Sequence, residues 1–248
     1  MRLPDEPSFW WGNFLLYDEP PAPGDGERWE AAFAAAFRDV PAVCHRTFGW
    51  DTTDGSLGSA HHEFLTRGYE LERRTGLLVD PEDIRDHPRA NAEVLIQPLN
   101  PAPGRDEPLW EQVLTVAVDS YEDPGQPREA LLTFARRRQD ALRCLFEDGR
   151  GAWYAAIDPT DGSVVGGCGV VATGSRGRFQ SVGVVASHRR RGIASRLVAQ
   201  AGRDAAAGHG LETLVISADP DYHALGLYTS LGFRAVEHVV GVQLPPST

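Results

Sequence analysis

Hydrophobic positions recur with clear spacing in the C-terminal two thirds of the chain. Strands are predicted at 92–97, 153–157, 164–173, 178–186, 213–217 and 233–244, and helices at 108–120, 127–147, 195–207 and 222–231. The Asp158–Gly162 segment is a strong turn signal between two of these strands. Antiparallel strands that lead into βαβ units predict an α/β fold with a mixed sheet.

The N-terminal part repeats the last portion of this order. Strands are predicted at 9–17, 43–48 and 69–79, and helices at 29–37 and 60–67, with a loop rich in proline and glycine at 19–26. At an offset of 164 residues Gly68 aligns with Gly232, and Tyr69 aligns with Phe233. This match favours a duplicated half-domain, and chance is the alternative. The polar, proline-flanked segment 80–89 marks the boundary, so we predict domains at 1–90 and 91–248.

Composition excludes several classes of protein. The 248 residues contain no apolar run near the roughly 20 residues that span a bilayer, and the N-terminus has no basic region typical of a secretory signal. The three cysteines have no CxxC spacing, and the histidines have no metal-ligand spacing. We therefore predict a cytoplasmic protein with no metal and no membrane association.

Charge is distributed unevenly. The formal net charge is −11, yet no Asp or Glu occurs between Ser163 and Arg203, a segment with seven arginines. An acidic body with one basic segment suits a compact polyanionic ligand and a cationic second substrate. Nucleic acid would need a broader basic face. We predict no nucleic-acid partner.

The segment Arg189–Ser195 is the strongest candidate for a binding site. It lies between a predicted strand and a predicted helix, and it contains three arginines and a glycine. The first amides of a helix have no intrahelical partner, and the helix dipole adds partial positive charge there. Such a turn is therefore suited to a pyrophosphate.

Two motifs together resemble the GNAT superfamily of acyl-CoA-dependent N-acyltransferases. The family's phosphate motif is Gln or Arg, two residues, Gly, one residue, then Gly or Ala, which here is Arg189-Arg190-Arg191-Gly192-Ile193-Ala194. The second motif is Asp221-Tyr222-His223-Ala224-Leu225-Gly226-Leu227-Tyr228, followed by Gly232-Phe233. The resemblance covers 92–244 and implies a GNAT-like fold, with 1–90 as a degenerate half-domain that has lost its phosphate turn.

The resemblance implies a role for each matching residue. The CoA-binding residues would be Val184, Val185, Arg189, Arg190, Arg191, Gly192, Ile193, Ala194, Ser195 and Asp221. Main-chain groups of Val184 and Val185 would pair with the pantetheine arm, and the amides of 190–195 would hold the pyrophosphate. Tyr228 would protonate the departing thiolate. Asp221 stands where the family usually has Asn. Its carboxylate can accept a hydrogen bond but cannot donate one.

The chemistry of acetyl transfer fits these residues. A thioester that is attacked directly by an amine needs a stabilised oxyanion and a protonated leaving thiol. The phenol of Tyr228 stays protonated at neutral pH, and the N–H of Val184 or Val185 is the expected oxyanion donor. The predicted strand 178–186 carries no acid. Asp219 is therefore the candidate general base, acting directly or through water.

We expect an acetyl-CoA-dependent N-acetyltransferase acting on a primary amine of a small molecule or peptide in a ternary complex. Two other interpretations stay open. The missing acid and Asp221 are also compatible with a CoA-binding regulatory module without catalysis. A dinucleotide-binding Rossmann domain is a weaker alternative, because the chain lacks the G-x-G-x-x-G turn.

Overall fold

The computed structural model describes residues 1–120 and 128–246 and divides into two compact units. The first unit comprises Met1–Gly76, Ala218–Tyr222 and the segment from Ala235 onward, and the second comprises Leu77–Ser217 and His223–Arg234. These units differ from the domains 1–90 and 91–248 that the sequence suggests, because the last strand pairs with a strand of the N-terminal part. That 1–90 is a degenerate half-domain stays a prediction.

The first unit contains the predicted order β-α-β-α-β. Its elements are β1 (Leu15–Tyr17), α1 (Asp25–Ala36), β2 (Arg46–Trp50), α2 (His61–Thr66) and the start of β3 (Glu70–Val79), joined by most of β9 (Arg234–Leu244). The strand order is β1-β2-β9-β3. β1 is parallel to β2, and β2 is antiparallel to β9, with Phe48 opposite Val242.

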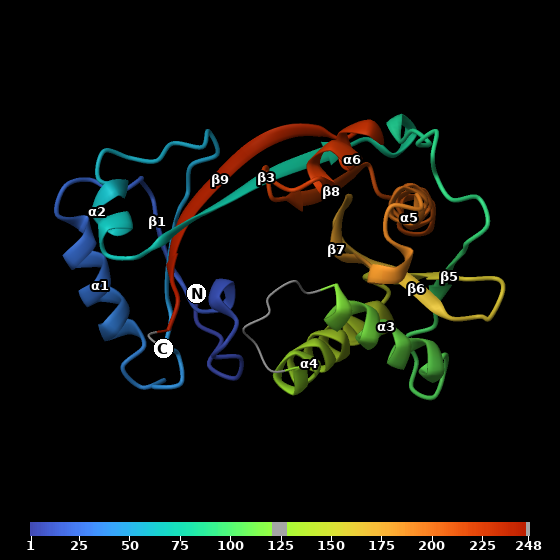
Figure 1. Cartoon of the computed structure of the whole chain (residues 1–248), viewed down its shortest axis with the longest axis horizontal. Coiled ribbons are helices and arrows are strands. Elements are labelled where there is room, and N and C mark those ends of the chain that lie inside the picture. The colour runs from blue at the N-terminus through green and yellow to red at the C-terminus, as the bar shows by residue number, and fades with distance from the viewer. Residues whose placement is uncertain (121–127, 247–248) are drawn as a thin grey trace. The chain divides into compact units, whose positions relative to one another are not determined.

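Aromatic side chains form the core of the first unit. Trp29 of α1 and Phe64 of α2 pack with Phe48 of β2, and each of the three is at most 1% exposed. The Tyr17 ring stacks on Trp29 with ring centroids 3.8 Å apart. Both helices therefore cover the same side of these strands, as Figure 1 shows beside β1.

The predicted strand at 9–17 is wrong over its first half. A 3₁₀ turn occupies Trp10–Gly12, and only Leu15–Tyr17 is extended. The reason is Asn13, whose fully buried side chain accepts a hydrogen bond from the Leu3 N–H and donates to the carbonyl of Glu6. Those local bonds fold the chain back on itself and offer its main chain an alternative to a sheet ladder.

The second unit confirms the predicted mixed sheet. Its elements are β4 (Leu95–Leu99), α3 (Glu107–Asp119), α4 (Arg128–Glu147), β5 (Gly151–Ile157), β6 (Val164–Thr173), β7 (Arg176–Val184), α5 (Ile193–His209), β8 (Thr213–Ala218) and α6 (Ala224–Ser230). The strand order is β3-β8-β7-β6-β5-β4. Strands β4 to β7 are antiparallel neighbours, whereas β7 and β8 are parallel. The predicted start of the 127–147 helix at Pro127 lies outside the described residues.

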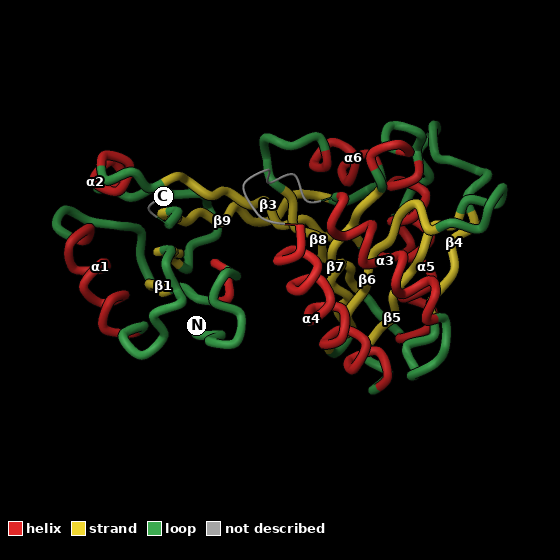
Figure 2. Tube along the Cα trace, turned by 60° about the horizontal axis from the view of Figure 1, so that its bottom comes forward, coloured by secondary structure: helices red, strands yellow, loops and turns green. Residues whose placement is uncertain are grey.

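Helices cover both faces of this second sheet. Figure 1 shows α5 on one side of β5, β6 and β7, and α3 and α4 on the other. In the turned view of Figure 2, α3 and α4 lie over the strands. None of the helices within 1–120 and 128–246 has the length and apolar character needed to cross a membrane.

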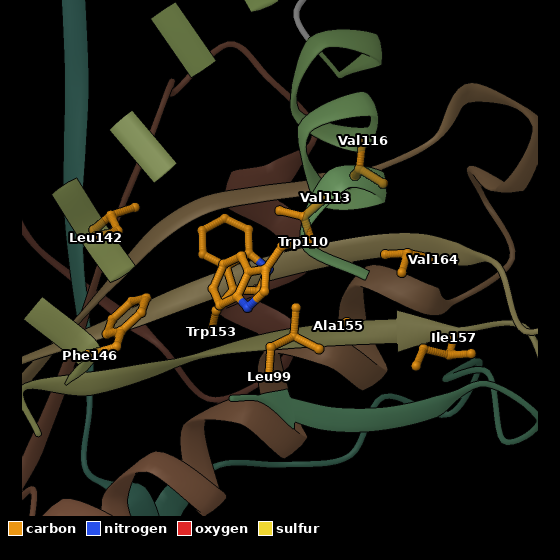
Figure 3. Packing of buried hydrophobic residues seen from close by; sticks show 10 residues of the cluster. All are labelled: Leu99, Trp110, Val113, Val116, Leu142, Phe146, Trp153, Ala155, Ile157 and Val164. Carbon is orange, nitrogen blue, oxygen red and sulfur yellow. The ribbon is translucent and has the colours of Figure 1, made fainter. Parts of the chain in front are cut away.

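Two tryptophans organise the core beneath α3 and α4. Trp110 of α3 and Trp153 of β5 have ring centroids 6.1 Å apart, and Leu142 and Phe146 of α4 complete the layer (Figure 3). The Trp110 indole N–H donates to the carbonyl of Asn100 at 2.9 Å, so this buried donor is satisfied. Together these contacts hold α3 and α4 against β5 and β6.

The segment 80–89, which the sequence marks as a boundary, packs against α5 within the second unit. Ile84 is 6% exposed, and its side chain reaches Gly202 of α5. Arg203 of α5 donates to the Ile84 carbonyl at 2.9 Å and to Asp86 at 2.8 Å. The segment is thus tied to the helix at two points.

We expect Arg203→Ala to lower the free energy of unfolding by about 1 kcal/mol, because a charged donor leaves the Ile84 carbonyl and the ion pair is partly exposed. Urea denaturation measures the change. The exposed Arg105→Ala is the control, with a change within about 0.5 kcal/mol. Equal effects of the two substitutions would contradict an anchoring role for Arg203.

Candidate functional site

The turn that opens α5 has the backbone conformation of an anion site. Arg190 has a φ of 61°, and Gly192, the N-cap of α5, has a φ of 76°. Left-handed residues that alternate with right-handed ones gather successive N–H groups on one side of the chain. The amides of Ile193, Ala194 and Ser195 then form the first turn of a 17-residue helix, where no intrahelical acceptor is available.

The neighbouring chain fixes the shape of this turn. Asn91 donates its main-chain N–H to the Gly192 carbonyl at 3.1 Å and its side-chain amide to the Arg191 carbonyl at 3.2 Å. Ser195, which is 2% exposed, donates its hydroxyl to the Gly192 carbonyl at 2.9 Å. The Ser195 side chain therefore supports the turn, and only its amide is left for a ligand.

The three arginines of the turn have different surroundings. Arg190 and Arg191 are exposed, as expected for side chains that meet a polyanion in solvent. Arg189 is half-buried, and its guanidinium donates to the carbonyls of Val184 and Asp119, each at 3.3 Å. Arg189 thus links the end of β7 to the end of α3.

The end of β7 carries a bulge. Gly169 lies opposite Gln180 and Gly167 opposite Gly183, so β7 has one extra residue there, and Ser181 has a φ of 49°. β8 runs parallel to β7 and pairs with it at Arg176–Arg178, before the bulge. A bulge at this point redirects the strand beyond it.

Val184 and Val185 differ in what their main chains offer. The Val185 N–H donates to the Val165 carbonyl at 3.0 Å, so it is already used. Val184 lies opposite Gly166, one position along the same antiparallel pair. Since alternate residues of such a pair turn their main-chain groups outward, the N–H and carbonyl of Val184 face away from β6. Of the two N–H groups expected to bind the oxyanion, only that of Val184 is therefore directed away from β6.

Tyr228 lies on α6 in the same unit and is 6% exposed. Its ring lies 6.1 Å from that of Phe233, which in turn lies 6.0 Å from Phe179 of β7. The Tyr228 ring is therefore held by Phe233, which itself packs on β7. A buried phenol of this kind keeps a polar tip on an apolar body.

Asp219 and Asp221 belong to the first unit. Asp219 accepts the Asp221 N–H at 2.8 Å, so one of its oxygens closes the turn after β8. Asp221 is exposed and lines a cavity of about 260 Å³ together with Asp54, Arg73, Thr75 and His238. The Asp219 side chain is thus bonded to the main chain of Asp221 within the first unit, whereas the phosphate turn, Val184 and Tyr228 belong to the second unit.

Glu72 of β3 is an acid that no sequence pattern singles out. Burial raises the pKa of its carboxyl, the charge of Asp219 adds to the rise, and Arg74 at 2.5 Å opposes it. A carboxylate with a raised pKa near a candidate base is a signal of function that depends on tertiary structure. Alternation along β3 alone does not reveal it.

The corresponding turn of the first unit is already filled by carboxylates. α1 begins at Asp25, whose side chain accepts the Ala22 N–H at 2.9 Å, and Glu63 accepts the Gly24 N–H at 3.3 Å. Negative charge at the start of α1 repels phosphate and occupies its donors. This geometry supports the prediction that the turn at 18–26 holds no phosphate.

Metal binding is not indicated by any cluster of side chains in the described ranges. Within 1–120 and 128–246 no group of three or more His, Cys, Asp or Glu residues is placed to hold a metal ion.

Comparison with known proteins identifies the domain. Residues 148–235 match the family model described as an acetyltransferase (GNAT) domain, and no curated protein matches the chain. A functionally unknown conserved protein from Staphylococcus epidermidis ATCC 12228 is similar in structure, with a TM-score of 0.78, 14% identity, and coverage of 99% of this chain and 90% of that one.

Two further solved structures have the same fold. A GCN5-related N-acetyltransferase from Kribbella flavida has a TM-score of 0.60 at 19% identity, covering 96% of this chain and 84% of that one. A tandem GNAT protein from the clavulanic acid biosynthesis pathway has a TM-score of 0.58 at 16% identity, covering 91% and 72%. Residues 148–235 are therefore a GNAT acetyltransferase domain, within a chain that has the mixed α/β fold of GNAT acetyltransferases.

Proposed function

We propose that the chain transfers an acetyl group from acetyl-CoA to an amine by direct attack in a ternary complex. The observation that carries the proposal is the turn that opens α5, with its left-handed Arg190 and Gly192, beside the outward main chain of Val184. The pyrophosphate binds the amides of 190–195, and the pantetheine arm extends along Val184. Exposed Arg190 and Arg191 add positive charge to the same place.

The reaction then follows from the groups around the thioester. The amine nitrogen attacks the carbonyl carbon, and the N–H of Val184 stabilises the oxyanion that forms. The C–S bond breaks, and the thiolate takes the phenolic proton of Tyr228. The amine must also lose a proton, and Asp219 is the candidate acceptor that the sequence suggests, acting directly or through water.

Turnover of acetyl-CoA with a broad panel of amines tests this function, with release of the CoA thiol as the readout. We expect thiol release that depends on the amine, and an acetylated amine as the second product. Tight binding of acetyl-CoA without turnover of any amine would instead support a CoA-binding regulatory module.

Asp219→Asn tests the proposed base. We expect kcat to fall about tenfold with an unchanged KM for acetyl-CoA, a modest effect because an amine that is already partly deprotonated needs no strong base. The pH profile separates Asp219 from Glu72. Removing the charge of Asp219 lowers the raised pKa of Glu72. If Asp219→Asn keeps the wild-type maximum of kcat and the acid limb of its pH profile moves to lower pH, Glu72 is the general base and Asp219 is not.

A further inference from the structure

The cavity of about 260 Å³ lies wholly within the first unit, and no step of the proposed reaction uses it. It is lined by β3 and β9, which are neighbouring strands (Figure 1), by the segment after β2 and by the turn after β8. Its volume is just below the roughly 300–1,000 Å³ of pockets that hold drug-sized ligands. The cavity therefore suits a small molecule.

The floor of the cavity is packed and hydrogen-bonded. Val240 of β9 is 4% exposed and belongs to the aromatic core of the first unit, and Thr75 of β3 is 1% exposed. Thr75 Oγ1 lies 3.2 Å from His238 Nδ1, a hydrogen bond that joins the two strands. Because side chains two positions apart share one face of a strand, Arg73 points to the same side as Thr75.

Carboxylates occupy one part of the lining, and hydrogen bonds hold them in place. The His238 N–H donates to the Thr53 carbonyl at 2.7 Å, so the segment after β2 is fixed beside β9. Asp54 Oδ1 accepts the main-chain N–H of Ser56 at 3.0 Å and also the Ser56 hydroxyl, which orients this carboxylate. Asp221 adds a second carboxylate to the same cavity. Two carboxylates attract a cation.

The cation that fits this cavity is an ammonium group. In the described part of the chain, no three His, Cys, Asp or Glu side chains are grouped as the ligands of a metal ion. An ammonium group needs no such coordination shell, because its three N–H groups each donate to a single acceptor.

Arg73 supplies the opposite charge. Arg74, the other arginine of the lining, is paired with Glu72 at 2.5 Å, whereas none of the described residues forms an ion pair with Arg73. The planar guanidinium matches a carboxylate with two parallel hydrogen bonds. A carboxylate in the cavity would therefore meet an arginine whose charge is not already compensated.

We propose that this cavity binds a small zwitterion, with its ammonium group at Asp54 and Asp221 and its carboxylate at Arg73. A free amino acid is the simplest molecule of this class. A simple cation would be repelled by Arg73, and a simple anion by the two carboxylates, so a ligand with both charges is favoured over either. The inference goes beyond acetyl transfer, because the ligand is either the acceptor amine or an effector that is not acetylated.

An NMR titration of the full chain with amino acids tests the inference. The probes are the common L-amino acids and β-alanine, each compared with its amide, which lacks the carboxylate, and with its N-acetyl derivative, which lacks the ammonium group. We expect at least one amino acid to shift the main-chain amide signals of Gly55, Thr75 and Val239 to saturation. It should bind at least about tenfold more tightly than either of its derivatives.

Arg73→Gln and Asp54→Asn separate the two ends of the ligand. Both side chains are exposed, and Asn keeps an oxygen that accepts from Ser56, so neither substitution disturbs the core. We expect Arg73→Gln to bind the amino acid and its amide equally. We expect Asp54→Asn to reduce the advantage over the N-acetyl derivative at least about threefold, because Asp221 remains.

Arg38→Gln and Asp51→Asn are the matched controls, since both residues are exposed in the same unit and lie outside the lining of the cavity. Both controls should keep both preferences. An amino-acid series that causes no saturable shift, or derivatives that bind as tightly as the amino acids, overturns the inference. So does a preference for the carboxylate that survives Arg73→Gln.

Addition of acetyl-CoA to the same sample separates this inference from the proposed function. A bound amino acid that gains an N-acetyl group is the acceptor, and one that stays bound and unmodified is an effector; both results support the zwitterion site. Amino-acid binding in a chain that acetylates no amine defeats the proposed function and leaves the inference standing. Acetylation of other amines without any amino-acid binding at the cavity defeats the inference alone.

Discussion

Gly192→Ala is expected to raise the Kd for acetyl-CoA at least about a hundredfold, which corresponds to about 2.7 kcal/mol of binding free energy. Gly192 has a φ of 76°, and a β-carbon built on it would lie 1.8 Å from the Arg89 carbonyl oxygen and 2.9 Å from the Asn91 nitrogen. Both contacts are with main-chain atoms, which cannot turn aside as a flexible side chain can. The turn must therefore move, and the amides of 190–195 lose their common direction.

Gly208→Ala is the matched control for this substitution, and isothermal titration calorimetry measures both affinities. Gly208 lies in the same helix, and a β-carbon there meets nothing within 4 Å. We expect an unchanged Kd and a gain of about 0.5–1 kcal/mol in the free energy of unfolding, as is typical for Gly to Ala inside a helix. Normal affinity in Gly192→Ala would show that the phosphate does not bind at this turn.

Tyr228→Phe is expected to lower kcat by about 10²–10³, the range typical of a lost general acid, with little change in the Kd for acetyl-CoA. The ring keeps its packing against Phe233, so only the proton donor is removed. Stopped assays of thiol release measure kcat, and calorimetry measures binding. The departing thiolate then takes its proton from water, at a lower rate.

Tyr154→Phe makes the same chemical change elsewhere in the second unit. Tyr154 lies on β5, is 3% exposed, and has a pKa raised mainly by burial. We expect its loss of a hydroxyl to leave kcat unchanged. Equal turnover in wild type and Tyr228→Phe would remove Tyr228 from the mechanism, and a similar loss in both variants would show that the effect is structural.

Local patterns predicted the second unit well because its elements are long and regularly spaced. The predicted strand at 164–173 coincides with β6, and the predicted helix at 108–120 lies within one residue of α3. The phosphate turn was also predictable, since a strand, a basic turn with a glycine and a helix are adjacent in sequence. Neighbours along the chain determine each of these features.

Features that depend on distant residues were not predictable. The side chain of Asn13 folds the segment before β1, although its aromatic residues resemble a strand. The pairing of β9 with β2 joins residues about 195 positions apart, which periodicity cannot show. The same holds for the candidate site, because Asn91 bonds to the carbonyl of Arg191, which lies 100 positions further along the chain.

The requirement for Gly192 also has a different cause from the one that sequence suggests. A glycine in a phosphate-binding turn allows the phosphate to approach the main chain closely. In the structure the Arg89 carbonyl already occupies the space that a side chain at position 192 would need, before any ligand binds. Folding and binding thus require the same residue for separate physical reasons, and the turn is shaped in advance for its ligand.

The position of the pyrophosphate in a crystal of the chain with acetyl-CoA tests the central claim most directly. The structure predicts its oxygens within hydrogen-bond distance of the main-chain amides of 190–195, with the pantetheine arm beside Val184. A pyrophosphate bound elsewhere on the chain, or crystals that exclude acetyl-CoA but take up NAD at this turn, would contradict it.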